Sequence, residues 1–398
     1  MTRLPNIQVL RAIAASMIVV YHCGIETTRM AAASGSDALF NIEPWGAGVP
    51  LLFAISGFIM VVTTADSFGS RAAAADFMRR RLIRIVPLYW LVTTFALAVV
   101  LVAPQLMKAP PGDYLYVIAS YLFFPYTRLG GDVRPLATPG WTLNLEMLFY
   151  AVFAVALLFP RRAGLSLLFG SLGLLVAARV GGLLPGVALN FWGDPIVLGF
   201  LLGAAAGIAY VKGVRLSFAA ALSLAALGFY ALSFTPDLTV PEDDLFRRLG
   251  AALPAAVIVA GFALAPQLDE RRRVWWLALA IGDASYSLYL IHEFLLRAFH
   301  IVWGKLAIEI VPLWVFIPLG IVISVTAALI LYRLFEKPVT RRLNGLGEPR
   351  DKARTPVLVR IPASVVPRAM DPLGSATADT PVFGKRIGHV RRARSFNA

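Results

Sequence analysis

The sequence is short of cysteine and of charge. Its single cysteine, Cys23, excludes an intramolecular disulfide and any cysteine-based metal cluster. Charged residues make up 15% of the 398 positions, against about 25% in soluble globular domains. No Walker motif or GxGxxG phosphate fingerprint occurs, so an ATP-driven pump has no support.

Hydrophobic residues make up 58% of the chain, and the mean hydropathy is +0.72. A helix of about 20 apolar residues crosses the hydrocarbon core of a bilayer. We therefore expect an all-α polytopic membrane protein, a bundle of about ten transmembrane helices in one membrane domain over residues 1–344. The apolar segments lie at about residues 8–24, 46–64, 82–104, 141–159, 164–180, 194–210, 217–234, 249–266, 277–302 and 313–333.

The net charge of +14 comes from basic clusters beside the apolar segments and in the C-terminal stretch. Cytoplasmic loops carry an excess of lysine and arginine, which explains these clusters without a nucleic-acid partner. Both termini are then cytoplasmic, in a bacterial inner membrane. The clusters between segments are Arg79–Arg81 with Arg84, Arg161 with Arg162, Lys212 with Arg215, Arg271–Arg273, and Lys337 with Arg341 and Arg342.

Two stretches fall outside this pattern. The apolar stretch at 114–125 would break the alternation of sides if it crossed the membrane, so we expect it to be re-entrant or interfacial. Residues 345–398 are rich in Pro, Arg, Ser and Ala without periodicity, which is typical of a disordered basic tail in the cytoplasm. That tail either binds anionic lipid headgroups or only helps to fix topology.

Ionisable side chains within apolar helices are costly, so each is a functional candidate. Arg11 and His22 are eleven positions apart in one segment, LRAIAASMIVVYH. At about 100° per residue they lie on one helix face, about 16 Å apart in depth. His22 suits a general base or an acyl-accepting nucleophile, because imidazole exchanges protons near neutral pH. The alternative is a buried histidine that only hydrogen-bonds a neighbouring helix.

Arginine and glutamate mark two further segments. Arg81 and Arg84, three apart at the mouth of the third segment, suit bidentate phosphate binding, or else they are positive-inside anchors. Glu146, in WTLNLEMLFY, is expected at a depth comparable to His22. There it would orient the imidazole, hydrogen-bond a sugar hydroxyl, or simply reach the outer surface.

Two motifs carry weaker signals. Ser56 and Gly57, in LLFAISGF, most simply permit close packing of helices. YSLYLIH places Tyr286, Tyr289 and His292 in the ninth segment, where His292 is the next histidine candidate after His22.

Taken together, the motifs resemble the acyltransferase family 3 membrane proteins, which O-acylate bacterial surface glycans. The opening NIQVLRAIAA is most similar to the exopolysaccharide-modifying subgroup. The matching motifs run in family order over about residues 5–340: LRAIAASMIVVYH, GVPLLFAISGF, RRRLIRIVPLYW, WTLNLEMLFY, DASYSLYLIH and FEKP. One departure is Met147, where a second acid often follows the position of Glu146.

The resemblance implies transfer of an acyl group, acetyl by default, from acyl-CoA to a glycan or lipid-linked saccharide. It assigns catalytic roles to His22, Arg11 and Glu146, and donor phosphate binding to Arg81 and Arg84. No permanently bound cofactor and no metal are expected. Other expected partners are membrane lipids and proteins of polysaccharide biosynthesis. Some family members carry a fused periplasmic hydrolase-like domain, and we expect none here, so that transfer would be completed in the membrane domain or with a partner.

Two alternatives belong to other classes of protein. A proton-coupled secondary transporter of a glycan or small solute also uses buried Arg, His and Glu, but no internal repeat supports it. Consumption of acetyl-CoA by the purified protein with a glycan acceptor separates the enzyme from the transporter. If the protein is instead a structural subunit of a polysaccharide export complex, the register of Arg11 and His22 and the pair Arg81 and Arg84 are coincidental. Normal glycan acylation after loss of the histidine and the arginines would support that alternative.

Overall fold

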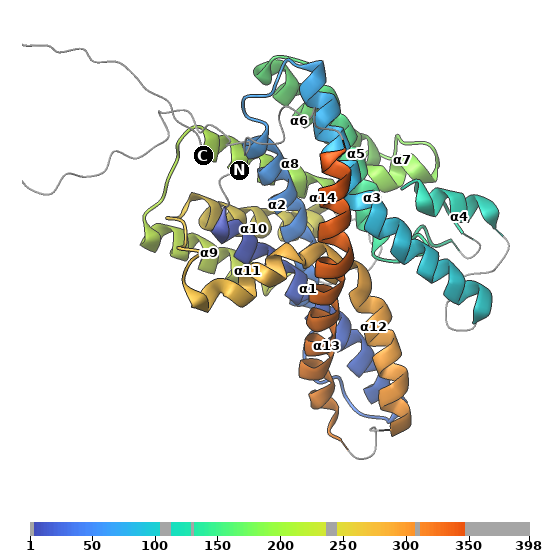
Figure 1. Cartoon of the computed structure of the whole chain (residues 1–398). Coiled ribbons are helices and arrows are strands. Elements are labelled where there is room, and N and C mark those ends of the chain that lie inside the picture. Colours follow the sequence, from blue (N-terminus) through green and yellow to red (C-terminus); the bar gives the residue numbers. More distant parts are fainter. Residues whose placement is uncertain (1–3, 104–112, 129–130, 236–244, 307–310, 347–398) are drawn as a thin grey trace, which may run out of the picture. The chain divides into compact units, whose positions relative to one another are not determined.

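The computed structural model describes residues 4–103, 113–128, 131–235, 245–306 and 311–346. Within these ranges every regular element is a helix, which confirms the all-α fold class (Figure 1). The helices are α1 (Pro5–Ala33), α2 (Gly48–Thr63), α3 (Arg71–Val102), α4 (Tyr114–Tyr121), α5 (Gly140–Ala156), α6 (Arg161–Val180), α7 (Gly186–Trp192), α8 (Leu198–Val211), α9 (Phe218–Leu232), α10 (Leu245–Leu264), α11 (Trp276–Asp283), α12 (Ser285–Leu306), α13 (Phe316–Leu331) and α14 (Lys337–Gly345).

Each of the ten predicted apolar segments coincides with a helix or a pair of helices. Among the described residues, 7 helices are long and apolar enough to span a membrane, or up to 8 if the bent pair α11 and α12 counts as one span. The two remaining segments form the shorter apolar helices α5 and α9. The chain is therefore a multi-pass membrane protein, and the expected count of about ten is approximate.

Helix α1 lies at the centre of the packing, in contact with α2, α10, α11, α12 and α13. Small residues allow these close approaches: Ala14 and Ala15 are fully buried. A Cβ on Gly48, the first residue of α2, would lie 2.5 Å from the Ala14 carbonyl oxygen. A helix so enclosed can carry polar side chains only where its neighbours supply partners or a cavity, and Arg11 and His22 are two such positions.

Helices α2 and α8 pack through glycines on both sides. A Cβ on Gly57 would lie 1.9 Å from the Phe200 carbonyl oxygen, and a Cβ on Gly203 would lie 1.9 Å from the Ala54 carbonyl oxygen. The close packing predicted for the Ser56–Gly57 pair is thus confirmed. It also fixes the rotation of α2, so that the Ser56 hydroxyl lies beside the Glu146 carboxylate of α5.

The ninth segment, predicted as one helix over 277–302, is broken. Helices α11 and α12 meet at an angle of 69° around Ala284. At this bend Asp283 accepts a hydrogen bond from Gln8, and the Ser285 hydroxyl accepts one from Arg11. The break therefore brings polar groups to the half-buried Arg11 of α1, which an unbroken apolar helix would not supply.

The stretch at 114–125 does not cross the membrane as a helix. Helix α4 has 8 residues, a length of about 12 Å, against a hydrocarbon core of about 30 Å. It is attached to α3, because Tyr89 donates a hydrogen bond to the Ser120 carbonyl and Trp90 donates one to the Tyr121 carbonyl. This agrees with the re-entrant or interfacial prediction.

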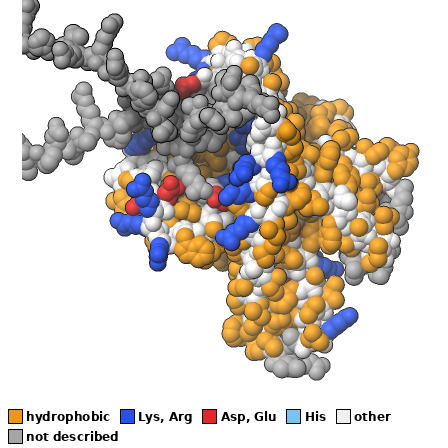
Figure 2. Space-filling view, viewed as in Figure 1, with side chains coloured by type: hydrophobic (Ala, Val, Ile, Leu, Met, Phe, Trp, Pro, Cys, Tyr) orange, Lys and Arg blue, Asp and Glu red, His pale blue; other side chains and the backbone are white. Residues whose placement is uncertain are grey.

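Two of the predicted cytoplasmic charge clusters lie together. The Arg79 guanidinium donates to the carbonyls of Leu343 and Asn344, so the first part of α3 and the end of α14 adjoin. Figure 2 shows lysine and arginine gathered around α14, whereas the surface over α13 is largely hydrophobic. The tail beyond residue 346 and the acidic stretch at 241–244 lie outside the described residues.

Candidate active site

Two cavities meet between the helices, and they share the side chains of Val49 and Tyr289. We call the smaller one the arginine pocket, with a volume of about 120 Å³, and the larger one the histidine chamber, with a volume of about 1080 Å³. The polar residues of the arginine pocket are Arg11, Ser56, Arg81, Arg84, Thr142, Glu146, Tyr150, Ser285, Tyr286 and Tyr289. Those of the histidine chamber are Tyr21, His22, Arg29, Asp132, Arg134, Thr138, Trp141, Arg179, Asn190, Asp194, Arg248, Tyr289, His292 and Glu293.

Three arginines line the arginine pocket against one carboxylate. Arg11 Nη2 lies 2.7 Å from the Ser285 hydroxyl and Arg11 Nη1 lies 3.2 Å from Gln8 Oε1. The Arg81 guanidinium stacks 5.6 Å and 5.7 Å from the ring centres of Phe77 and Tyr150. Its Nε is buried and has no hydrogen-bond partner among the described residues. The pocket thus keeps an unused hydrogen-bond donor at Arg81.

Glu146 belongs to the arginine pocket. Its carboxylate accepts hydrogen bonds from the Tyr150 hydroxyl and, at 3.2 Å, from the Ser56 hydroxyl. The expectation that Glu146 orients the His22 imidazole is therefore not met in this structure. Sequence gives the depth of a residue along its own helix, but the rotation of α5 decides where the side chain points, and here it points toward α2 and α3.

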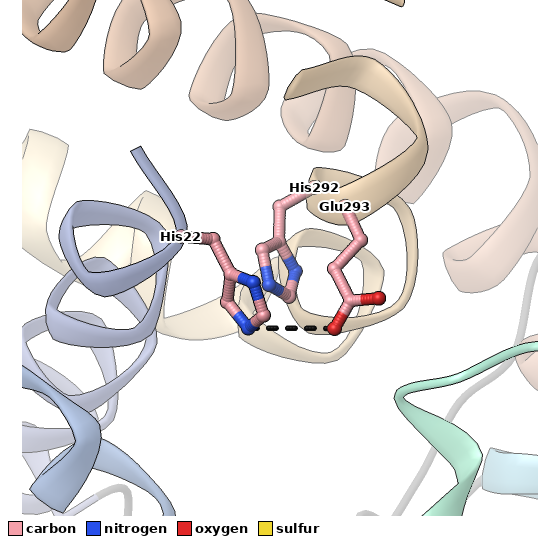
Figure 3. Close-up of side chains that lie close together, drawn as sticks. All are labelled: His22, His292 and Glu293. Atoms are coloured by element: carbon pink, nitrogen blue, oxygen red, sulfur yellow. Dashed lines mark ion pairs between the residues drawn. The ribbon is translucent and has the colours of Figure 1, made fainter. Parts of the chain in front are cut away.

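The carboxylate beside His22 is Glu293, from α12. His22 Nε2 lies 3.3 Å from Glu293 Oε1, and the His22 and His292 rings meet edge to face with centres 4.8 Å apart. Figure 3 shows the His22 and His292 rings and the Glu293 carboxylate converging from two helices. A carboxylate at Nε2 favours the tautomer with its proton on that nitrogen, which leaves the lone pair of Nδ1 available.

His292 has a tautomer that the backbone dictates. Its Nδ1 lies 2.8 Å from the Tyr289 carbonyl oxygen and 3.1 Å from the Leu288 carbonyl oxygen. Carbonyls only accept, so Nδ1 carries the proton and Nε2 carries a lone pair. Nε2 is buried and has no hydrogen-bond partner among the described residues. The site therefore holds an unused acceptor beside His22.

Helix α1 serves both cavities, since it presents Arg11 to the arginine pocket and His22 to the histidine chamber. Arg81 and Arg84 share the pocket with Arg11, as the predicted phosphate site requires. The roles of these residues stay predictions.

Sequence reasoning missed Glu293 and underrated Tyr289 and His292. One signal was present, because Glu293 is a carboxylate inside an apolar segment and such a residue is costly unless it is used. Tyr289, whose hydroxyl lies 2.7 Å from Thr142 Oγ1 and 3.1 Å from the Pro139 carbonyl oxygen, could be recognised as the divider between two cavities only from the fold.

Comparison with known proteins gives the family of the chain. The family model described as "Acyltransferase domain", of acyltransferase family 3, matches residues 4–333. The chain belongs to this family and is a membrane O-acyltransferase. The result decides for the enzyme over the transporter and structural-subunit alternatives.

One relative is the exopolysaccharide production protein ExoZ of Rhizobium meliloti (strain 1021). It is 35% identical over 306 residues, which cover 74% of this chain and 90% of the relative. No solved structure matches the chain.

Proposed function

We propose that this enzyme transfers an acyl group, acetyl by default, from acyl-CoA to a hydroxyl of an exopolysaccharide or another cell-surface glycan. The observation that carries the proposal is the shared wall at Tyr289. On one side of it lies a pocket rich in arginine, and on the other lies a large chamber with a histidine and a carboxylate. The name of the relative ExoZ supports an exopolysaccharide as the acceptor.

The arginine pocket suits the donor. CoA carries phosphates, and guanidinium groups bind phosphate oxygens in bidentate fashion. A volume of about 120 Å³ is too small for the whole of CoA, so we place only a phosphate group of the donor here, at Arg81 and Arg84, and the pocket must widen to admit the arm that carries the thioester. Arg11, held by Ser285 and Gln8, then directs the thioester toward Tyr289.

The histidine chamber suits the acceptor. Its volume of about 1080 Å³ is large enough for several sugar units, and it is lined by groups that bind hydroxyls: arginines, aspartates, Asn190 and Trp141. Arg29 and Arg134 line this chamber together with His22. A saccharide bound in the chamber would thus present a hydroxyl to His22.

The chemistry then follows in one transfer step. The lone pair of His22 Nδ1 takes the proton of the acceptor hydroxyl while its oxygen attacks the thioester carbonyl carbon. The C–S bond breaks, the new C–O bond forms, and His22 returns the proton to the thiolate of CoA. Glu293 stabilises the imidazolium that exists between these events. Because the two cavities meet at Tyr289, the acceptor hydroxyl can attack the thioester directly. The proposed reaction therefore has no covalent enzyme intermediate.

The proposal includes an orientation of the protein in the inner membrane. Acyl-CoA approaches from the cytoplasm, so the arginine pocket opens on the side of the basic clusters and both termini. The acceptor, free or lipid-linked, reaches the histidine chamber from the other side, in contact with lipids and with polysaccharide biosynthesis proteins.

The test uses detergent-purified protein with acetyl-CoA and oligosaccharides of the surface glycan from cells that lack this enzyme. We expect release of free CoA only when acceptor is present, and a mass increase of one acetyl group per oligosaccharide. Initial rates at varied donor and acceptor should give intersecting reciprocal plots, as a ternary complex requires. Parallel plots would instead show an acyl-histidine intermediate, and no mass increase with any acyl-CoA would refute the proposal.

A further inference from the structure

We propose that His22, His292 and Glu293 form a binding site for one divalent transition-metal ion, best suited to Zn²⁺, and that the bound ion stops acyl transfer. One ligand atom from each residue lies within 4.8 Å of the others. His22 Nε2 and Glu293 Oε1 are 3.3 Å apart. Ligands of a tetrahedral zinc ion, at bond lengths of about 2.0–2.1 Å, are about 3.3 Å from one another. Two of the three atoms already have this separation, and the His292 ligand atom lies within 4.8 Å of both.

The strongest evidence for a ligand is the state of His292. A histidine that binds a metal nearly always donates its second ring N–H to a carbonyl or carboxylate, which sets the tautomer and the direction of the ring. His292 Nδ1 does this with two backbone carbonyls. Its Nε2 is then a lone pair in a residue that is only 1% exposed, without a hydrogen-bond partner in the described part of the chain. A buried acceptor left unused costs free energy that a metal ion would recover.

The donor set selects the class of ion. Two imidazoles and one carboxylate suit Zn²⁺ and its neighbours in the first transition row, whereas Mg²⁺ and Ca²⁺ prefer sites made of oxygen alone. The three residues also line the histidine chamber, so a fourth coordination position faces water. The only cysteine, Cys23, contacts Ile317 and supplies no thiolate to the ion.

Metal binding and catalysis exclude each other for a chemical reason. This step rests on the proposed function, in which the lone pair of His22 Nδ1 removes the acceptor proton. An ion at Nε2 displaces the proton from that nitrogen, so a neutral imidazole must carry its proton on Nδ1. The lone pair that transfer needs is then absent. The ion also occupies the carboxylate that would stabilise the imidazolium.

Binding is measured first, independently of activity. The full chain is purified in detergent without a polyhistidine tag, freed of metal with EDTA, and titrated with Co²⁺ by absorption and with Zn²⁺ by equilibrium dialysis. We expect one ion per chain. His292→Asn keeps an N–H near the position of Nδ1 but removes Nε2, so the Kd should rise at least about 100-fold. The matched control is His300→Gln, on the same helix but paired with Glu26, and it should bind as the unaltered protein does.

Inhibition is measured as the activity each protein retains with Zn²⁺ relative to its own activity in EDTA. At a Zn²⁺ concentration ten times the Kd, the unaltered enzyme should keep about a tenth of its transfer rate by mass action, and EDTA should restore it. Absence of binding would overturn the proposed metal site. Binding without inhibition, or loss of activity in EDTA, would overturn the proposal that the bound ion stops acyl transfer. Failure of transfer in both EDTA and Zn²⁺ would count against the proposed function alone, since the dialysis still decides whether the site exists.

Discussion

Replacing Glu293 with glutamine tests the contact that the structure added to the mechanism. The change removes one negative charge 3.3 Å from His22 Nε2 and keeps the size of the side chain. Two unit charges at this distance interact by about 5 kcal/mol at an effective dielectric of about 20. Both side chains are 25% exposed, so solvent weakens the interaction. We expect kcat to fall between about 10-fold and 10³-fold, because the imidazolium loses its counter-charge and the amide can hold the wrong tautomer.

The assay is initial-rate transfer with saturating acetyl-CoA, at equal amounts of protein in the membrane. Glu293→Asp keeps the charge on a shorter arm and should restore part of the rate. Glu43→Gln makes the same chemical change at an exposed position outside both cavities, and it should leave kcat unchanged. Unaltered kcat in Glu293→Gln would refute the role assigned to the carboxylate. A raised acceptor KM with unaltered kcat would make Glu293 a binding group instead.

Four further outcomes are expected. His22→Gln should lower transfer by about 10²- to 10⁴-fold at matched membrane abundance, the usual cost of removing a general base, and near-normal transfer would clear His22 of any role. Arg81 and Arg84 changed together to lysine should raise the KM for acyl-CoA more than that for the acceptor, since lysine keeps charge but loses the bidentate fork. The opposite pattern would move these arginines to the glycan. Gly57→Leu should reduce the amount of folded protein in membranes, because the backbone of α8 occupies the space that the leucine side chain would need. The folded fraction is measured by thermal aggregation. Truncation after Leu346 should leave transfer intact, and a stable but inactive product would show that the tail takes part.

Much of the fold could be predicted because the bilayer imposes length and composition on each helix. All ten apolar segments became helices, and the short stretch at 114–125 was correctly excluded as a span. The break between α11 and α12 could not be predicted, because it depends on contacts with Gln8 and Arg11, more than 270 positions away in sequence. The hydropathy of residues 277–302 does not depend on these distant partners, so it cannot reveal the break.

The site divides in the same way. Arg11, Arg81 and Arg84 meet in one pocket, and His22 lies in the adjoining chamber, as their positions along the helices suggested. Glu146 was one candidate for the carboxylate beside His22, and the structure places Glu293 there instead. Glu146 and Glu293 are both acids inside apolar segments, and only the rotation and packing of their helices decide which of them faces the imidazole.

The divider at Tyr289 has a consequence for the membrane itself. In the orientation proposed above, the arginine pocket and the histidine chamber belong to opposite aqueous compartments. Tyr289, with its hydrogen bond to Thr142, and Val49 form the wall that the two cavities share. Such an enzyme must transfer an acyl group from one side to the other without letting protons and small ions through. The electrochemical gradient across the membrane drives these ions toward the shared wall at all times. Tyr289→Ala would then do more than slow a reaction. In sealed vesicles it should let a pH gradient decay, turning the transferase into a leak.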